Sequence, residues 1–129
     1  MVRIAIVGGP RAGKTTLAGV LGRELEFPIV HADDLIDLGW SGASDHLAER
    51  IALAVGPCIW EGVMVVRALR KVLHAGPERP VDQCIVLDQP WVPLTAGQRA
   101  MRRGCATVLA EIEPELVRRG VEFVRPVRS

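Results

Sequence analysis

The chain has 129 residues, of which 49% are hydrophobic and 24% charged, and its formal net charge is +1 at pH 7. Domains cluster near about 100–150 residues, so we expect residues 1–129 to form a single domain. The near-zero net charge excludes a strong sequence-wide attraction to nucleic acid. No apolar run approaches the roughly 18 residues that a membrane-spanning helix needs, so no membrane partner is expected.

The three cysteines, Cys58, Cys84 and Cys105, are widely spaced and form no Cys-x-x-Cys pair. Isolated cysteines in odd number are typical of free thiols in a reducing compartment. The apolar N-terminal run is only as long as a strand and leads directly into a glycine-rich loop, which is unlike a signal peptide. The sequence therefore predicts a cytoplasmic protein with buried, unpaired thiols.

The first apolar run, residues 2–7, predicts a strand that leads into a phosphate-binding motif. Residues 8–15 match the pattern G-x-x-x-x-G-K-[ST], in which the glycines let backbone N–H groups wrap around phosphate. Lys14 would reach the outer phosphates, Thr15 would offer its hydroxyl to Mg²⁺, and the positive end of the next helix would face the same anion. The loop residues expected to contact a nucleoside triphosphate are Gly8, Gly9, Pro10, Arg11, Ala12, Gly13, Lys14, Thr15 and Thr16.

After this loop, hydrophobic periodicity alternates between helical and strand-like spacing. In chain order, we expect a helix over 14–25, a strand over 27–30, a loop or short helical turn over 33–40, a helix from Ser44 or Asp45 to about 55, a strand over 58–60, a helix over 64–75, a strand over 84–87, a helix over 107–119 and a strand over 121–124. Strands that alternate with helices predict a parallel sheet covered by helices on both faces. The loops at the carboxyl ends of the strands should then lie together.

Segment 31–55 carries candidate residues for the acceptor side of such a site. Asp33 and Asp34 follow the second strand, so a carboxylate there would point into the cleft and could accept a proton from an acceptor hydroxyl. Helix capping or a solvent-exposed position is the alternative for either residue. Trp40 is a candidate for stacking on a substrate ring.

The third strand ends in a charged residue, Glu61. A carboxylate behind Ile59 and Trp60 is costly to bury without a partner, so we expect it beside the phosphate loop, holding a Mg²⁺-bound water or the acceptor. Arg67 and Arg70 lie one helical turn apart beyond it and could hold an acidic acceptor or simply face solvent.

Segment 89–104 is basic and contains no acidic residue. Its arginines, Arg99, Arg102 and Arg103, could neutralise the charge on a phosphoryl group in flight if the segment closes as a lid. Exposed surface is the alternative for each of them. We therefore expect a short, lid-like segment here.

These motifs together resemble the P-loop kinases of the nucleoside and nucleoside-monophosphate kinase type. The resemblance rests on the phosphate loop, on Asp33 after the second strand, on the acid-glycine pair Glu61-Gly62, and on Asp88-Gln89-Pro90 followed by the three arginines. It implies a three-layer αβα P-loop NTPase fold whose five-stranded parallel sheet has the strand order 2-3-1-4-5.

The expected activity is transfer of the γ-phosphate of ATP, with Mg²⁺, to a hydroxyl or phosphate of a small molecule or nucleotide. In this reading Lys14, Asp33, Glu61 and the lid arginines are catalytic, and Thr15 and Glu61 serve the metal. Two alternatives stay open: an ATPase or NTP-binding module acting on a protein partner, and a kinase of hydroxymethylated bases in DNA. The acceptor and the oligomeric state are left open.

Overall fold

The computed structural model describes residues 2–126, and for residues 36–38 it describes the backbone alone. Strands alternate with helices along this part of the chain. In order, the elements are β1 (Arg3–Val7), α1 (Lys14–Leu25), β2 (Ile29–His31), the 3₁₀ helix η1 (Ala32–Leu38), α2 (Gly39–Leu53), β3 (Cys58–Glu61), α3 (Val65–Ala75), β4 (Gln83–Val86), α4 (Ala96–Arg118) and β5 (Glu122–Val124).

The five strands form one parallel sheet in the order β2-β3-β1-β4-β5, which confirms the expected order. At its centre, Ile6 of β1 pairs with Glu61 of β3 and with Ile85 of β4. His31, the last residue of β2, is also in register with Glu61. Because all strands run in one direction, the loops that follow them gather at one edge of the sheet.

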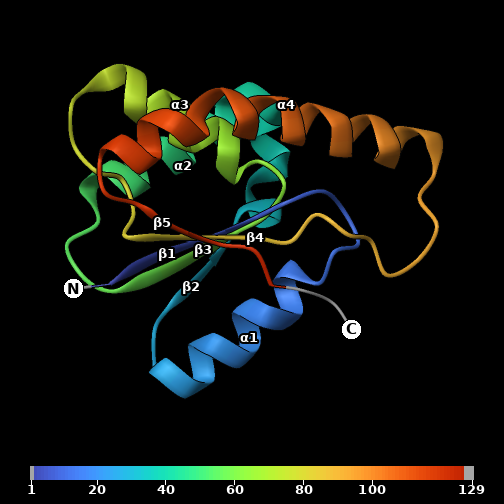
Figure 1. Ribbon diagram of the computed structural model, residues 1–129, viewed down its shortest axis with the longest axis horizontal. Coiled ribbons are helices and arrows are strands. Elements are labelled where there is room, and N and C mark those ends of the chain that lie inside the picture. Colours follow the sequence, from blue (N-terminus) through green and yellow to red (C-terminus); the bar gives the residue numbers. More distant parts are fainter. Residues whose placement is uncertain (1, 127–129) are drawn as a thin grey trace.

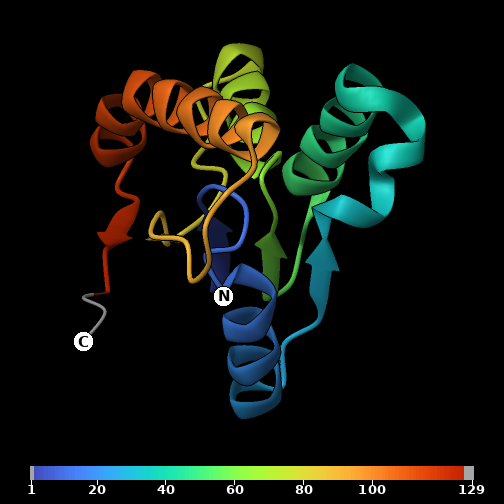
Figure 2. The same ribbon diagram turned by 90° about the vertical axis from the view of Figure 1, so that its right-hand side faces the viewer.

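The helices cover the two faces of the sheet unequally, as Figures 1 and 2 show. Helices α2, α3 and α4 lie over one face, and α1 lies on the other. The larger core cluster packs under the three helices and includes the fully buried Leu69 and Leu116. A smaller cluster under α1 is built around Ile6 and Ile59, which are also fully buried. This is the three-layer α/β arrangement that the alternating pattern predicts.

The cysteines are free and buried, as expected. Burial raises the pKa of Cys84 to about 12, and burial likewise raises the pKa of Cys58 and of Cys105. Thiols in such surroundings stay protonated and unreactive. Separately, no helix within residues 2–126 combines the length and the apolar character needed to cross a membrane.

Helix α2 begins earlier than the sequence predicts. It starts at Gly39 rather than at Ser44 or Asp45, so neither residue is the expected N-terminal cap. The buried Ser44 hydroxyl donates to the carbonyl of Ser41 at 3.1 Å and accepts from Lys71 of α3 at 2.8 Å. Ser44 therefore joins α2 to α3 instead of opening the helix.

Helix α4 also begins earlier, at Ala96 rather than near residue 107. The Thr95 hydroxyl accepts from the Gln98 N–H at 3.1 Å, while the Gln98 side chain accepts from the Thr95 N–H at 3.0 Å. This reciprocal capping box satisfies two backbone donors and outweighs the low helix propensity of Gly97. Residues 96–104 of the lid-like segment 89–104 are thus the first turns of a long helix.

The far end of α4 is tied to α3 through Arg119. Its guanidinium donates to three backbone carbonyls where α3 ends, at 3.2 Å to Leu73 and at 2.7 Å to both Gly76 and Glu78. Its Nε also donates to Glu115 at 2.7 Å. One planar, multidentate cation thus supplies donors to carbonyls that helix geometry leaves unpaired.

We expect Arg119→Ala to lower the free energy of unfolding by about 2 kcal/mol, since several charge-assisted hydrogen bonds are lost together. Urea unfolding followed by circular dichroism measures this change. As the control, Arg118→Ala removes an exposed partner of the same Glu115 and should leave the free energy of unfolding nearly unchanged. Equal costs for the two variants would contradict this account of Arg119.

This stabilisation should depend on pH. Hydrogen bonds from Arg118 and Arg119 lower the pKa of Glu115 from 4.5 to about 2. A carboxyl whose pKa is depressed by folding stabilises the protein above its unfolded pKa and loses this contribution as pH falls toward the folded value. The difference in the free energy of unfolding between wild type and Arg119→Ala should therefore become smaller below about pH 4.5.

Candidate active site

The phosphate loop passes from the end of β1 to the start of α1 in a conformation that requires glycine at two places. Gly8 has a φ of 144°, and a Cβ added to it would lie 1.7 Å from the carbonyl oxygen of Leu87. Gly13 has a φ of 90° and directly precedes Lys14, the first residue of α1. Both values lie where only glycine is unstrained. The loop therefore lies tightly over the end of β4 and presents the N-terminus of α1 to a cavity.

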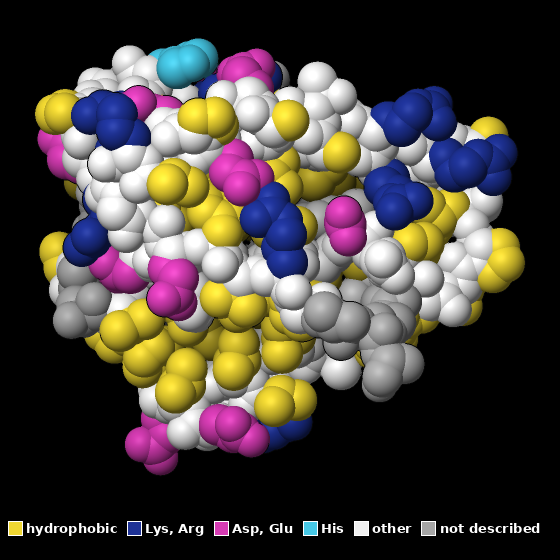
Figure 3. All heavy atoms as spheres, in the orientation of Figure 1, with side chains coloured by type: hydrophobic (Ala, Val, Ile, Leu, Met, Phe, Trp, Pro, Cys, Tyr) yellow, Lys and Arg dark blue, Asp and Glu magenta, His cyan; other side chains and the backbone are white. Residues whose placement is uncertain are grey.

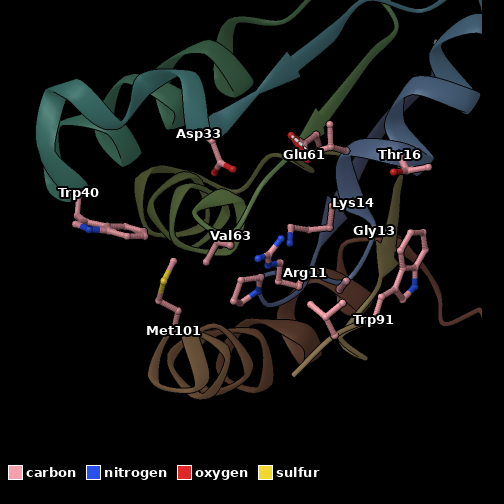
Figure 4. Close-up of a pocket in the computed structure, with 14 residues that line it drawn as sticks. Arg11, Gly13, Lys14, Thr16, Asp33, Trp40, Glu61, Val63, Trp91 and Met101 are labelled. Carbon is pink, nitrogen blue, oxygen red and sulfur yellow. Dashed lines mark hydrogen bonds between the residues drawn. The ribbon is translucent and has the colours of Figure 1, made fainter. Parts of the chain in front are cut away.

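This cavity has a volume of about 620 Å³, and Figure 4 shows its lining. The phosphate loop forms one wall from Pro10 to Thr16. The other described walls come from segments distant in sequence: Asp33, Trp40, Glu61, Val63, Trp91, Val92 and Met101. The structure thus brings the phosphate loop together with Asp33, Trp40 and Glu61, all three of which the sequence singles out.

Lys14 is a buried cation at the centre of this arrangement. Its side chain donates to the carbonyl of Gly9 and is 7% exposed. Burial is the main cause that lowers the pKa of Lys14, and the nearby carboxylate of Glu61 acts in the opposite direction. A desolvated ammonium held against the phosphate loop is suited to an anionic ligand, which would replace the lost solvation.

Glu61 is almost completely buried at 1% exposure and has two side-chain partners. The Thr15 hydroxyl donates to its carboxylate, at 3.2 Å to Oε2 and 3.4 Å to Oε1. His31 Nδ1 lies 2.8 Å from Oε1. Glu61, the charged end of β3, is thus buried with hydrogen-bonding partners for its carboxylate.

His31 is a site residue that the sequence reasoning missed. The sequence shows only a histidine at a strand end, a position where packed polar residues are common. The useful signal is the register of the sheet, because parallel pairing places His31 directly beside Glu61. A histidine that hydrogen-bonds a ligating carboxylate fixes the orientation of that carboxylate.

The oxygen atoms of Thr15 and Glu61 fit a magnesium ion. Hydroxyl and carboxylate oxygens are ligands that Mg²⁺ accepts, and it usually takes only one or two protein ligands beside water and phosphate. Among the side chains that the structure describes, those of residues 2–35 and 39–126, no cluster of three or more His, Cys, Asp or Glu forms a candidate metal site. Separately, one hydroxyl and one carboxylate are the few protein ligands expected for a Mg²⁺ that arrives with a nucleotide.

The acceptor-side candidates separate into two groups. Asp33 and Trp40 line the cavity, and the Arg67 guanidinium lies 5.8 Å from the centroid of the Trp40 ring. Arg67 itself lines an adjoining cavity of about 360 Å³ together with Trp40. Asp34 is exposed and is not among the described residues that line the main cavity, and Arg70 pairs with Glu111 of α4 at 3.5 Å. The structure does not bring these last two residues to the cavity.

The arginines of the basic segment 89–104 do not line the main cavity as those of a closed lid would. Arg99, Arg102 and Arg103 are exposed and are not among the described residues lining the main cavity. Arg99 donates to the carbonyl of Leu94 at 2.8 Å. The stem of Arg102 packs on the phosphate loop, since a Cβ at Gly9 would lie 2.8 Å from its Cγ. Arg102 thus contacts the loop at Gly9.

No protein-family model matches the sequence, and the search of curated proteins found no match. The structure is similar to that of a shikimate kinase from Acinetobacter baumannii solved with shikimate, at 13% identity and a TM-score of 0.62, covering 100% of this chain and 85% of that one. A gluconokinase from Sinorhizobium meliloti 1021 has 13% identity and a TM-score of 0.54, and the match covers 99% of this chain and 84% of that one. A shikimate kinase from Bacteroides thetaiotaomicron has 17% sequence identity and a TM-score of 0.51, and the match covers 95% of this chain and 85% of that one.

At these identities the likeness concerns the fold. The chain shares the α/β fold of these kinases, and its own five-stranded parallel sheet has the order β2-β3-β1-β4-β5. The neighbours themselves are kinases of small molecules, one of them holding shikimate in its structure.

Proposed function

We propose that this protein is a kinase that binds ATP with Mg²⁺ and transfers the γ-phosphoryl group to a hydroxyl of a small molecule. One observation carries the proposal: the phosphate loop, the Thr15–Glu61 oxygen pair and the carboxylate of Asp33 all line one cavity. The small-molecule kinases of similar fold support it. The acceptor itself is left for experiment.

The nucleotide end of the site is built to hold phosphate and metal. Lys14 and the N-terminus of α1 would bind the outer phosphates, with Arg11 beside them on the cavity wall. Thr15 and Glu61 would hold Mg²⁺, which supplies charge neutralisation at the phosphates when bound. His31 keeps the carboxylate of Glu61 oriented.

The acceptor end is centred on Asp33. An acceptor hydroxyl placed beside it would attack the γ-phosphorus, and the bond between that phosphorus and the β–γ bridging oxygen would break, leaving ADP. Asp33 would take the proton that the hydroxyl releases. Trp40 and Arg67 would contact the body of the acceptor, and movement at the start of α4 would bring Arg102 toward the transferring phosphate.

Thr15→Val should raise the Mg²⁺ concentration needed for half-maximal turnover by about 10- to 100-fold, because it removes one oxygen ligand at constant volume. Glu61→Gln should act in the same direction, since an amide is a weaker ligand than a carboxylate. Titrating turnover and ATP binding against Mg²⁺ measures both effects. Thr15→Ser keeps the hydroxyl and serves as the control. An unchanged metal dependence in Thr15→Val and Glu61→Gln would remove these two residues from the metal site.

An acceptor screen with γ-labelled ATP tests the proposed function. Nucleosides, nucleotides, sugars, hydroxy acids and DNA carrying hydroxymethylated bases are offered separately, and label transfer is followed. A kinase should consume ATP slowly alone and much faster with one acceptor class. Rapid hydrolysis that no acceptor changes would instead favour an ATPase acting on a protein partner, and label found on DNA would identify a kinase of DNA bases.

A further inference from the structure

A separate cavity of about 380 Å³ lies along the first half of α4. Helix α4 contributes most of its lining, and Gly8 and Gly9 of the phosphate loop form one side. Among the described residues, none lines both this cavity and the main one. Its volume is near the lower end of the roughly 300–1,000 Å³ typical of small-molecule sites, so it suits a compact ligand. The proposed phosphoryl transfer gives this space no role.

The buried part of the lining is apolar. It consists of Val86 of β4 and of Cys105 and Leu109 of α4. Ala106 and Ala110 also line the cavity from α4 and are exposed. Burial raises the pKa of Cys105, as expected for a thiol in weakly solvated surroundings. A ligand that fills this part of the cavity should therefore present an apolar body to it.

The charged part of the lining has an excess of positive charge. It consists of three arginines and two carboxylates, namely Arg102, Arg103, Arg125, Asp88 and Glu113. Arg125 pairs with Glu113 at 2.5 Å, which neutralises that carboxylate. Among the residues that the structure describes, neither Arg102 nor Arg103 has an ion-pair partner, and Figure 3 shows basic side chains gathered over the first turns of α4. Two arginines thus remain beside one carboxylate, Asp88, and they suit an anionic group.

Arg102 connects this cavity with the catalytic site. Its stem packs on Gly9 of the phosphate loop. In the proposed function, its guanidinium moves toward the transferring phosphate when the start of α4 moves. An anion bound in the cavity would oppose this movement, because the guanidinium would have to leave one anion to reach the other.

We propose that this cavity binds a small organic carboxylate with a compact apolar body, and that the bound carboxylate slows phosphoryl transfer by retaining Arg102. The apolar body would lie on Val86 and Leu109, and the carboxylate would accept hydrogen bonds from Arg102 and Arg103. Binding follows from the cavity alone, whereas the effect on turnover rests on the proposed function.

Three probes test the expected ligand chemistry. Benzoate carries a ring and a negative charge, benzylamine carries the ring with the opposite charge, and acetate carries the negative charge alone. Each is titrated into wild type while the amide signals of Gly8, Gly9 and Ala110 are followed by NMR. Benzoate should bind at least about 10-fold more tightly than either other probe, since it gains both ring burial and charge-assisted hydrogen bonds. Benzylamine or acetate binding as tightly as benzoate would overturn the proposal.

Variants locate the site. Ala106→Leu fills the cavity and should weaken benzoate binding by about 10-fold or more, whereas Ala52→Leu, at an exposed alanine of α2 outside the cavity, should leave it within about twofold. Both substitutions keep a good helix former. Arg103→Gln should weaken binding of benzoate and not of benzylamine, and it decides the matter if urea unfolding shows that Ala106→Leu is unfolded. Unchanged benzoate affinity in the folded variants would overturn the proposal.

A competition experiment separates this cavity from the phosphate loop. Inorganic tripolyphosphate with Mg²⁺ should leave benzoate affinity within about twofold, because the two cavities have no described lining residue in common. Displacement of benzoate by tripolyphosphate would place it on the phosphate loop and overturn the proposal.

Turnover at saturating ATP and acceptor tests the effect on catalysis. Benzoate should lower it by about fivefold or more in wild type and in Ala52→Leu. Ala106→Leu should turn over within about twofold of wild type without benzoate and should not respond to it. Benzoate that binds in the cavity and leaves wild-type turnover unchanged would overturn the role given to Arg102. If the acceptor screen finds no kinase, the effect on turnover fails with the proposed function, while the titrations still decide the binding site.

Discussion

Asp33→Asn should slow phosphorylation of the acceptor by about 10²–10⁴-fold, the range expected for loss of a positioned general base. Asparagine keeps the shape of the side chain and can still accept a hydrogen bond, but it cannot take the proton. ATP affinity should change little, because Asp33 lies across the cavity from the phosphate loop in Figure 4. Single-turnover measurements with saturating ATP give the rate, and calorimetry gives the affinity.

The neighbouring Asp34 provides the matched control. It has the same chemistry and sits on the same 3₁₀ helix, yet it is not among the described residues lining the cavity. Asp34→Asn should therefore leave the rate within about twofold of wild type, as expected of a surface substitution. If Asp34→Asn is the damaging change and Asp33→Asn is harmless, the base is the other aspartate. If both variants keep full activity, neither carboxylate takes the proton.

Lys14→Met should lower turnover by about 10²–10³-fold or more, since it removes a preorganised cation from the position of the transferring phosphates. Methionine keeps most of the apolar stem, so the packing around the phosphate loop should survive. Burial lowers the pKa of Lys14, and replacing the ammonium removes its desolvation cost in the free protein. The free energy of unfolding of Lys14→Met should consequently not fall below that of wild type.

Two measurements on Lys14→Met separate function from folding. Turnover with the acceptor found in the screen measures the effect on function, and urea unfolding measures the effect on the free energy of unfolding. Loss of turnover together with lost stability would mean that Lys14 is structural. Normal turnover would show that residues 8–16 do not hold the phosphates.

Wild type should also respond to alkaline pH. Burial lowers the pKa of Lys14 below 10.5, so its positive charge is lost at a lower pH than that of an ordinary lysine. Affinity for tripolyphosphate should therefore weaken as pH rises through that lowered value.

The parts of the structure that the sequence predicted are those set by local rules. A strand, a glycine-rich turn and a helix in succession define the phosphate loop, and α1 covers 14–25 in both prediction and structure. Alternating elements predicted the parallel sheet. Asp33 and Glu61 lie where strands end, and the carboxyl ends of parallel strands meet at the same edge of the sheet as the loop.

The parts that the sequence did not show depend on contacts between distant residues or on competing local signals. The pairing of His31 with Glu61 follows from strand register, and the pairing of Arg70 with Glu111 follows from how α3 meets α4. The early start of α4 was readable in Thr95 and Gln98, but the glycine and arginine content of segment 89–104 favoured a loop.

The solitary position of α1 has a consequence beyond the site. In the part of the chain that the structure describes, α1 lies apart from the other α-helices, and Figure 3 shows hydrophobic side chains gathered where it meets the sheet. Elements with few neighbours are the first to open locally, and a ligand that binds only the closed form suppresses such opening. A nucleotide held by residues 8–16 would clamp the first turn of α1. Limited proteolysis of the purified protein without nucleotide should then begin at α1, and added nucleotide should slow it.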